Sequence, residues 1–175
     1  MKEHYLKSLP KIKGLVFDID GVMTDGTVTI FPSGEMVRQL NVKDGYAIKT
    51  ASLKGLKVGV VTGGKNLQMK DRLLDLGVHD VYLSSANKPE KLEEFCLAHD
   101  LKPEEILYMG DDLPDYEVLQ SVGIATCPKD AAHEIREICS YISPFEGGKG
   151  CVRDVIEKVL RTQDKWFNEQ SDFQW

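Results

Sequence analysis

The stretch Ile12-Lys-Gly-Leu-Val-Phe-Asp18-Ile-Asp20-Gly21 decides the fold of this chain. Its first part is a short apolar run, which predicts a buried strand at Ile12–Phe17. Two carboxylates and a glycine follow directly, and acids at this spacing direct both side chains toward the same crevice. Such a pair is too polar for a core. The stretch therefore predicts a buried strand that leads into a polar site.

Apolar runs alternate with amphipathic helical patterns along the rest of the chain. We predict further strands at Leu56–Val61, Val81–Leu83, Ile106–Met109, Gly123–Thr126 and Tyr141–Ile142. Helices are predicted around them at Gly45–Leu53, Lys65–Leu76, Pro89–Ala98, Pro114–Ser121, Ala131–Ile138 and Val152–Leu160. Strands that are apolar throughout are typical of a parallel sheet with helices on both faces. The predicted fold class is therefore α/β, with a doubly wound, mainly parallel sheet.

One segment interrupts this alternation. Two β-rich runs, Gly26–Phe31 and Glu35–Leu40, flank the turn Pro32-Ser33-Gly34 and predict a β-hairpin in place of a crossover helix. We expect the hairpin to form a flap at about residues 22–40 of a single domain, residues 1–162. A polar tail, residues 163–175, is expected either to dock on a neighbouring subunit or to be disordered. Its aromatic residues are Trp166, Phe167, Phe173 and Trp175.

The composition is that of a soluble globular protein. A chain of 175 residues, 42% hydrophobic and 29% charged, suits one domain that needs no disulfide or structural metal. The net charge of −6 argues against an extended nucleic-acid surface. Because no apolar stretch is long enough to span a bilayer and the N-terminus lacks a secretory signal, we expect no membrane partner. The four cysteines match no metal or disulfide pattern, which favours a reducing, cytoplasmic environment.

Polar groups recur where the other predicted strands end. Thr62-Gly63-Gly64 follows the second strand, Lys88 opens the helix after the third, and Gly110-Asp111-Asp112-Leu-Pro-Asp115 follows the fourth. Each motif alone has a structural explanation, as a turn, a helix cap or a surface lysine. Together they meet at the carboxyl edge of a parallel sheet, where ligands bind. Clustered carboxylates with a lysine, a threonine and free N–H groups suit Mg²⁺ and a phosphoryl group.

The order of these motifs resembles that of the haloacid dehalogenase-like phosphatases: Asp18-x-Asp20-Gly21-Val22, Thr62, Lys88 and Gly110-Asp111-Asp112-x-x-Asp115. The resemblance implies hydrolysis of a phosphomonoester through an aspartyl-phosphate. Asp18 would be the nucleophile and Asp20 the general acid and base. Thr62 and Lys88 would hold the transferred oxygens.

The same resemblance implies a metal site for Mg²⁺. Its ligands would be the carboxylate of Asp18, the backbone carbonyl of Asp20 and the carboxylate of Asp111. Asp112 and Asp115 would orient Lys88 and the waters on the metal.

Short spacings between the motifs leave room for the hairpin alone, so the chain looks like a capless member of this family. Two more segments, Asn41-Val-Lys-Asp-Gly45 and Gly147-Gly-Lys-Gly-Cys-Val-Arg153, closely resemble the 3-deoxy-D-manno-octulosonate 8-phosphate (KDO 8-phosphate) phosphatases. That resemblance implies a phosphorylated sugar acid of lipopolysaccharide synthesis as substrate, and a homotetramer in which a neighbour's hairpin closes the site. It implies substrate contacts from Asp20, Asn41, Val42, Lys43, Asp44, Gly45, Lys49, Gly64, Arg72 and Lys88.

Gly64 departs from the pattern of that family, which usually reads Thr-Gly-Arg at this motif. The departure leaves a nine-carbon, sialic-type sugar acid 9-phosphate open as the substrate. Two other classes of protein fit the motif pattern less well. A response-regulator receiver domain normally carries its phosphorylated aspartate after a middle strand, whereas Asp18 and Asp20 here follow the first. A non-catalytic phosphosugar-binding protein would be expected to lack one of these two acids.

Overall fold

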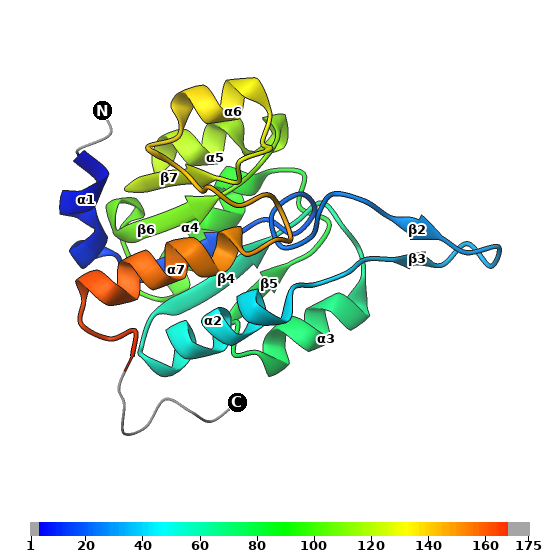
Figure 1. The fold of residues 1–175 in the computed structure, drawn as a ribbon, viewed down its shortest axis with the longest axis horizontal. Helices are drawn as coiled ribbons and strands as arrows, with labels where there is room; N and C mark the ends of the chain where they lie inside the picture. Colours follow the sequence, from blue (N-terminus) through cyan, green and yellow to red (C-terminus); the bar gives the residue numbers. More distant parts are fainter. Residues whose placement is uncertain (1–3, 168–175) are drawn as a thin grey trace.

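A parallel sheet organises the part of the chain that the computed structural model describes, residues 4–167 (Figure 1). Six strands form it in the order β5-β4-β1-β6-β7-β8, and every neighbouring pair is parallel. Their bounds are β1 Gly14–Phe17, β4 Lys57–Val61, β5 Asp80–Tyr82, β6 Ile106–Met109, β7 Ile124–Cys127 and β8 Tyr141–Ile142. All six predicted strands are present, and β1, which precedes the two acids, lies in the middle of the sheet between β4 and β6.

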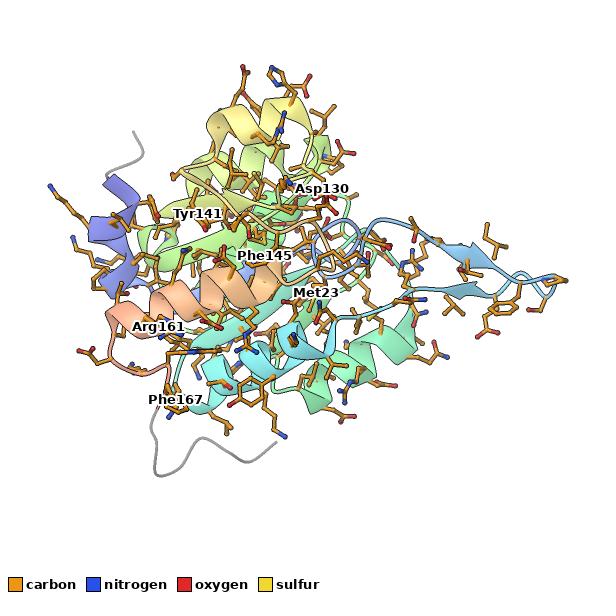
Figure 2. The ribbon with its side chains drawn as sticks, in the orientation of Figure 1. Met23, Asp130, Tyr141, Phe145, Arg161 and Phe167 are labelled. Atoms are coloured by element: carbon orange, nitrogen blue, oxygen red, sulfur yellow. The ribbon has the colours of Figure 1, made fainter. Side chains whose placement is uncertain are left out.

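Helices cover both faces of this sheet. One face packs against α2 (Val42–Leu53), α3 (Leu67–Asp75) and α7 (Cys151–Thr162), and the other against α4 (Lys88–Ala98), α5 (Tyr116–Ser121) and α6 (His133–Ile138). Side chains fill the space between the helices and the sheet (Figure 2). In β1, Leu15 and Phe17 join the first of these two apolar clusters, and Val16 joins the second. The doubly wound α/β prediction is confirmed.

Asparagine side chains determine where three helices begin. The Oδ1 atoms of Asn41, Asn66 and Asn87 accept backbone N–H groups of the first helical turn, at 2.9, 2.8 and 3.3 Å. These caps start α2 earlier than the predicted Gly45 and α3 later than the predicted Lys65. Apolar spacing reveals the body of a helix, but its first residue depends on the side chain that satisfies the free N–H groups.

The sequence prediction missed α1 (His4–Ser8), which at five residues is too short to show a helical repeat. It also missed two 3₁₀ turns, η1 (Leu9–Lys11) and η2 (Pro103–Glu105), and the predicted helix Pro114–Ser121 is divided between a third, η3 (Leu113–Asp115), and α5. Within residues 4–167, no helix combines the length and the apolar composition that crossing a membrane requires.

The predicted hairpin is present as an arm that projects from the sheet (Figure 1). Its strands, β2 (Thr29–Ile30) and β3 (Met36–Val37), pair antiparallel and are shorter than the predicted runs. The arm is exposed along its length, including Ile30 at 69% and Met36 at 50%.

Trp166 packs back onto the core although it lies beyond the end of α7. Its side chain is only 8% exposed. The indole meets the ring of Tyr46 edge-on at 6.4 Å, and the guanidinium of Arg153 lies 5.3 Å from the indole centroid. Phe173 and Trp175, the other end of the predicted tail, lie outside the described residues, and the boundary after residue 162 stays a prediction.

We expect Phe95→Ala to lower the free energy of unfolding by about 3–5 kcal/mol, because a buried aromatic side chain leaves a cavity. The Phe95 ring is fully buried, and a Cβ placed on Gly59 of β4 would lie 2.9 Å from it, so at this position the sheet has no side chain that could fill the gap. Leu97→Ala on the same helix is the control, since Leu97 is 87% exposed and should change stability by about 0.5 kcal/mol or less. Urea denaturation measures both, and equal losses would contradict the packing described here.

Candidate active site

The carboxyl edge of the sheet gathers the polar motifs into one cavity of about 580 Å³. Asp18 follows β1, Thr62 follows β4, and the loop that contains Asp111 follows β6. The cavity is lined by Asp18, Asp20, Gly21, Gly26, Thr62, Gly63, Gly64, Ser85, Ala86, Lys88, Asp111, Asp112, Pro114 and Asp115. Every residue predicted to be catalytic, to bind the metal or to orient these groups therefore lies in the wall of a single cavity.

A buried ion network occupies the floor of this cavity. Lys88 Nζ lies 2.9 Å from Asp18 Oδ2 and 2.7 Å from Asp115 Oδ1. The Tyr108 hydroxyl of β6 also donates to Asp115 Oδ1, at 2.7 Å. Burial opposes the charge on Lys88, but the two carboxylates outweigh it and raise the pKa of the ammonium above its usual value. Lys88 therefore stays charged. Through Lys88 and Tyr108 the network connects Asp18 to α4 and to β6.

Three carboxylates crowd this floor. Asp18, Asp111 and Asp115 each place an oxygen within 4.8 Å of the others. Burial, followed by repulsion from Asp115, raises the pKa of Asp18 to about 6 against the opposing effect of Lys88. Burial and repulsion from Asp18 and Asp115 raise the pKa of Asp111 to about 7. Burial is the larger cause of both shifts, and repulsion among the three carboxylates adds to it. Hard oxygen donors gathered in this way suit a divalent cation such as Mg²⁺.

Two glycines allow the acids to approach the backbone this closely. A Cβ on Gly21, whose φ is +84°, would lie 1.9 Å from Asp111 Oδ2, and one on Gly110 would lie 2.3 Å from the Asp115 carboxyl carbon. Because both contacts are far inside van der Waals distance, any side chain at either position would displace an acid of the cluster. The glycines of the two sequence motifs thus have a steric purpose.

Thr62 and Asp112 line the cavity wall in less constrained positions. The Thr62 hydroxyl accepts the backbone N–H of Gly64 at 3.1 Å, which holds the turn after β4. Asp112 is exposed, and its Oδ1 accepts the N–H of Leu113 at 2.8 Å, at the start of η3. The threonine hydroxyl and the neighbouring glycine backbone present hydrogen-bonding groups to the open cavity.

Arg38 is a member of the site that the sequence reasoning missed. It follows β3 at the base of the hairpin, and its Nε lies 2.5 Å from Asp20 Oδ1 while its Nη2 lies 3.2 Å from Asp20 Oδ2. Hydrogen bonding to Asp20 raises the pKa of Arg38 above its usual value. In the sequence Arg38 is an arginine within a predicted β-strand of the hairpin, and such a residue is equally well explained as an exposed strand residue.

The predicted substrate contacts fall into two groups. Asp20, Gly64 and Lys88 line the catalytic cavity. A second cavity of about 150 Å³ is lined by Met23, Leu40, Asn41, Val42, Asp44, Gly45, Arg72 and Leu76, and it shares no lining residue with the first. Lys43 and Lys49 lie on α2 and are not among the lining residues of either cavity. Within one chain, the structure does not bring the predicted substrate residues together.

Asp44 ties the second cavity to the core. Its Oδ1 accepts the backbone N–H of Arg153 in the first turn of α7 at 2.8 Å, which joins α2 to α7. Its Oδ2 is buried and has no hydrogen-bond partner within residues 4–167. Burial raises the pKa of Asp44 to about 6, although hydrogen bonds from Arg153 and Gly150 oppose the shift.

Comparisons with known proteins agree with this geometry. A model of the haloacid dehalogenase-like hydrolases matches residues 74–153. The 3-deoxy-D-manno-octulosonate 8-phosphate phosphatase of Salmonella typhi is 33% identical over 166 residues, which cover 93% of this chain and 86% of the relative. The Yersinia pestis phosphatase of the same name superposes with a TM-score of 0.89 at 32% identity, covering 91% and 86% of the two chains. The Moraxella catarrhalis enzyme, solved with magnesium, phosphate and KDO, gives a TM-score of 0.89 at 25% identity and covers 94% of each chain.

We expect Asp44→Asn to change how stability depends on pH. Since the folded-state pKa of about 6 exceeds the unfolded value of about 4, the folded protein binds the extra proton, and the stability that Asp44 contributes falls as pH rises from about 4 to 6. Asparagine does not titrate, so the stability of the variant relative to wild type should rise across this window by up to about 3 kcal/mol. Urea denaturation at pH 4 and pH 7 measures the change. The exposed Asp75→Asn is the control, and an Asp44→Asn difference that is constant with pH would contradict the raised pKa.

Proposed function

We propose that this chain, which belongs to the family of 3-deoxy-D-manno-octulosonate 8-phosphate phosphatases among the haloacid dehalogenase-like hydrolases, hydrolyses KDO 8-phosphate to KDO and inorganic phosphate. The observation that carries the proposal is the buried network of Asp18, Lys88 and Asp115, which lies beside Asp111. The network opens to a cavity of about 580 Å³, and Asp20, two residues after Asp18, lies in the wall of that cavity. A cavity of this volume holds a small phosphorylated sugar.

Asp18 is the nucleophile in this proposal. Its Oδ1 accepts the N–H of Ile19 at 2.7 Å and its Oδ2 pairs with Lys88, so the carboxylate is held at the cavity floor in one orientation. In-line attack by this carboxylate on phosphorus forms an aspartyl-phosphate and releases the sugar oxygen. The covalent step divides one difficult displacement into two easier ones.

Asp20 serves as general acid and then as general base. It protonates the departing sugar oxygen, and it later removes a proton from the water that hydrolyses the aspartyl-phosphate. Its partly exposed side chain lies at the cavity wall, where it can reach a leaving group and exchange protons with solvent. Positioned proton transfer of this kind contributes about 10²–10⁴ in rate.

Lys88 and Thr62 bind the oxygens of the transferred phosphoryl group. Lys88 carries a positive charge at the floor of the cavity, and Thr62 contributes its hydroxyl with the backbone of Gly63 nearby. Such donors stabilise charge that accumulates on the phosphoryl oxygens in the transition state. Asp115 keeps Lys88 in place, since it accepts a hydrogen bond from the ammonium.

Mg²⁺ fits the acidic cluster of this chain. Asp18 and Asp111 would hold it together with the backbone carbonyl of Asp20, and Asp112 would orient waters around it. When bound, the metal offsets the repulsion between the nucleophilic carboxylate and the phosphate. The clustering of carboxylate oxygens from Asp18, Asp111 and Asp115 within 4.8 Å of one another supports the assignment, because a bound cation would relieve their mutual repulsion.

We also propose that four copies assemble so that the hairpin of one closes the cavity of another. The exposed apolar side chains of the arm support this role, Ile30 and Phe31 among them. The second cavity, lined by Asn41, Asp44 and Arg72 among others, also supports the assembly. It shares no lining residue with the catalytic cavity of its own chain, so its predicted substrate residues could complete the site of a neighbour. Free cysteines and the sugar-acid substrate support a cytoplasmic role in lipopolysaccharide precursor synthesis.

A nine-carbon, sialic-type 9-phosphate is the second candidate substrate. Gly64 favours it, because a glycine leaves the cavity wall beside Thr62 without a side chain. A longer sugar acid has more room at an open wall than at a filled one.

Phosphate release with KDO 8-phosphate, the nine-carbon 9-phosphate and hexose phosphates tests the proposed function. We expect kcat/KM for KDO 8-phosphate to exceed the others about tenfold or more, equivalent to about 1.4 kcal/mol of transition-state binding. We expect Asp18→Asn to abolish turnover with a folded chain by circular dichroism, because an amide does not form the acyl-phosphate. The exposed Asp75→Asn should retain full activity. Normal turnover in Asp18→Asn would rule out the covalent mechanism.

Magnesium should raise the melting temperature of the wild-type protein. At a concentration 100 times its Kd, a ligand that binds only the folded state adds about 2.7 kcal/mol, or about 5–10 °C for a domain of this size. Asp111→Asn should lose most of this shift and, without metal, should be at least as stable as wild type, because it removes a carboxylate whose pKa is raised. Differential scanning fluorimetry measures both effects, with Asp75→Asn as the control. An unchanged magnesium shift in Asp111→Asn would place the metal elsewhere.

A further inference from the structure

Arg38 is only partly exposed, on a segment whose other side chains are largely exposed. Its side chain is 14% exposed, whereas Met36 and Val37 just before it are 50% and 40% exposed. The guanidinium reaches into the cavity wall and engages both carboxylate oxygens of Asp20. A forked, bidentate pair of this kind is the geometry with which arginine recognises carboxylates in general.

This ion pair conflicts with the proposed role of Asp20 as general acid and base. A general acid needs one carboxyl oxygen to carry a proton and to face the leaving group. In the structure Arg38 donates to both oxygens of Asp20, so the carboxyl group is turned toward the guanidinium and not toward a leaving group. The ion pair therefore has to open before the sugar oxygen is protonated, and Arg38 then needs another anion.

A hollow of only about 10 Å³ lies beside Arg38, so a substrate carboxylate would have to take the place that the Asp20 carboxylate occupies in the pair. Arg38 lines it together with Asp20, Thr62 and Gly64, and these last three also line the catalytic cavity, so the two hollows share a wall. A Cβ on Gly64 would lie 3.4 Å from Thr62 Oγ1 and 3.9 Å from Asp20 Oδ2. Because Gly64 has no side chain, the approach from the cavity to Asp20, and so to its pair with Arg38, is not blocked at this point of the wall.

Lys88, the other cation described in this cavity, is already paired with carboxylates. Lys88 contacts two carboxylates, Asp18 and Asp115, at the buried floor, where the phosphoryl group reacts. An acidic group elsewhere on the substrate would meet Arg38, which lies nearer the hairpin and pairs with a partly exposed acid.

We propose that Arg38 determines specificity by binding the carboxylate of the sugar acid, exchanging its ion pair with Asp20 for one with the substrate. This inference rests on the proposed function and adds a residue to it. The exchange releases Asp20 beside the leaving oxygen only when the substrate carries a carboxylate. Phosphate esters without one leave Asp20 paired with Arg38 and are hydrolysed slowly for that reason.

Arg38→Gln tests the exchange with two substrates, KDO 8-phosphate and glucose 6-phosphate, which has no carboxylate. We expect the variant to raise KM for KDO 8-phosphate about tenfold to a hundredfold, the usual effect of losing a hydrogen-bonded charge pair. The kcat/KM for glucose 6-phosphate should stay equal or increase, because Asp20 is no longer held. The ratio of the two kcat/KM values should therefore fall at least tenfold. Arg136→Gln, which removes an exposed arginine from α6, is the matched control and should leave the ratio unchanged.

Arg38→Lys gives a second variant that keeps the charge and loses the fork. We expect its KM for KDO 8-phosphate to lie between those of wild type and Arg38→Gln. It also keeps the test decisive if Arg38→Gln fails to fold, which melting temperatures would reveal, because any rise in KM confined to the sugar acid supports the exchange.

Two results would overturn the inference. If Arg38 only positions Asp20, the variants lower kcat for both substrates by the same factor and leave their ratio intact. If Arg38 is a surface residue without a role, neither substrate is affected. Wild-type protein that fails to hydrolyse KDO 8-phosphate would instead overturn the proposed function, and this inference with it, so the two failures are distinguishable.

Discussion

The burial of Lys88 between Asp18 and Asp115 is the constraint on which the rest of the site depends. The Lys88 side chain is 5% exposed, and those of Asp18 and Asp115 are 11% and 1% exposed, so removing Lys88 leaves two buried carboxylates without their cation, at a cost of about 3–5 kcal/mol. The three residues come from the ends of β1 and β6 and from the first residue of α4. Parallel pairing with Phe17 opposite Met109 sets these strand ends at the same level. The geometry of the site therefore follows directly from the topology and register of the sheet.

Much of this arrangement could be predicted because buried parallel strands and their polar ends leave strong local signals. An uninterrupted apolar run followed by Asp18-Ile-Asp20-Gly21 identifies a strand and the position of its site without knowledge of the neighbours. Lys88 was predictable for a different reason. It is one of many lysines, and its place in the site became apparent only through the order in which it follows Thr62 and precedes Asp111. The motif order, rather than the residue itself, carried the information.

The parts that could not be predicted are those that depend on long-range packing. Arg38 lies 18 positions from Asp20, on an exposed hairpin without a buried face, and the path of that hairpin determines their pairing. Trp166 packs on Tyr46 across the chain although its own segment has no apolar repeat. Asp44 is buried because α2 docks against the start of α7, an arrangement no local pattern specifies. In each case the decisive partner is remote in sequence, and the residue's own neighbourhood indicates an exposed position.

Charge explains why such a site would need both its metal and its substrate. When all groups are ionised, and apart from the exposed Asp112, the four carboxylates of Asp18, Asp20, Asp111 and Asp115 face two cations, Lys88 and Arg38, and two negative charges remain. A phosphate dianion entering this cavity meets net repulsion, which a divalent cation would cancel. The two ion pairs then differ in what they do. The pair with Lys88 is buried and fixed, so it preserves the nucleophile between turnovers. The pair at Asp20 is partly exposed and can open at lower cost, which makes it the one that a substrate is able to exchange.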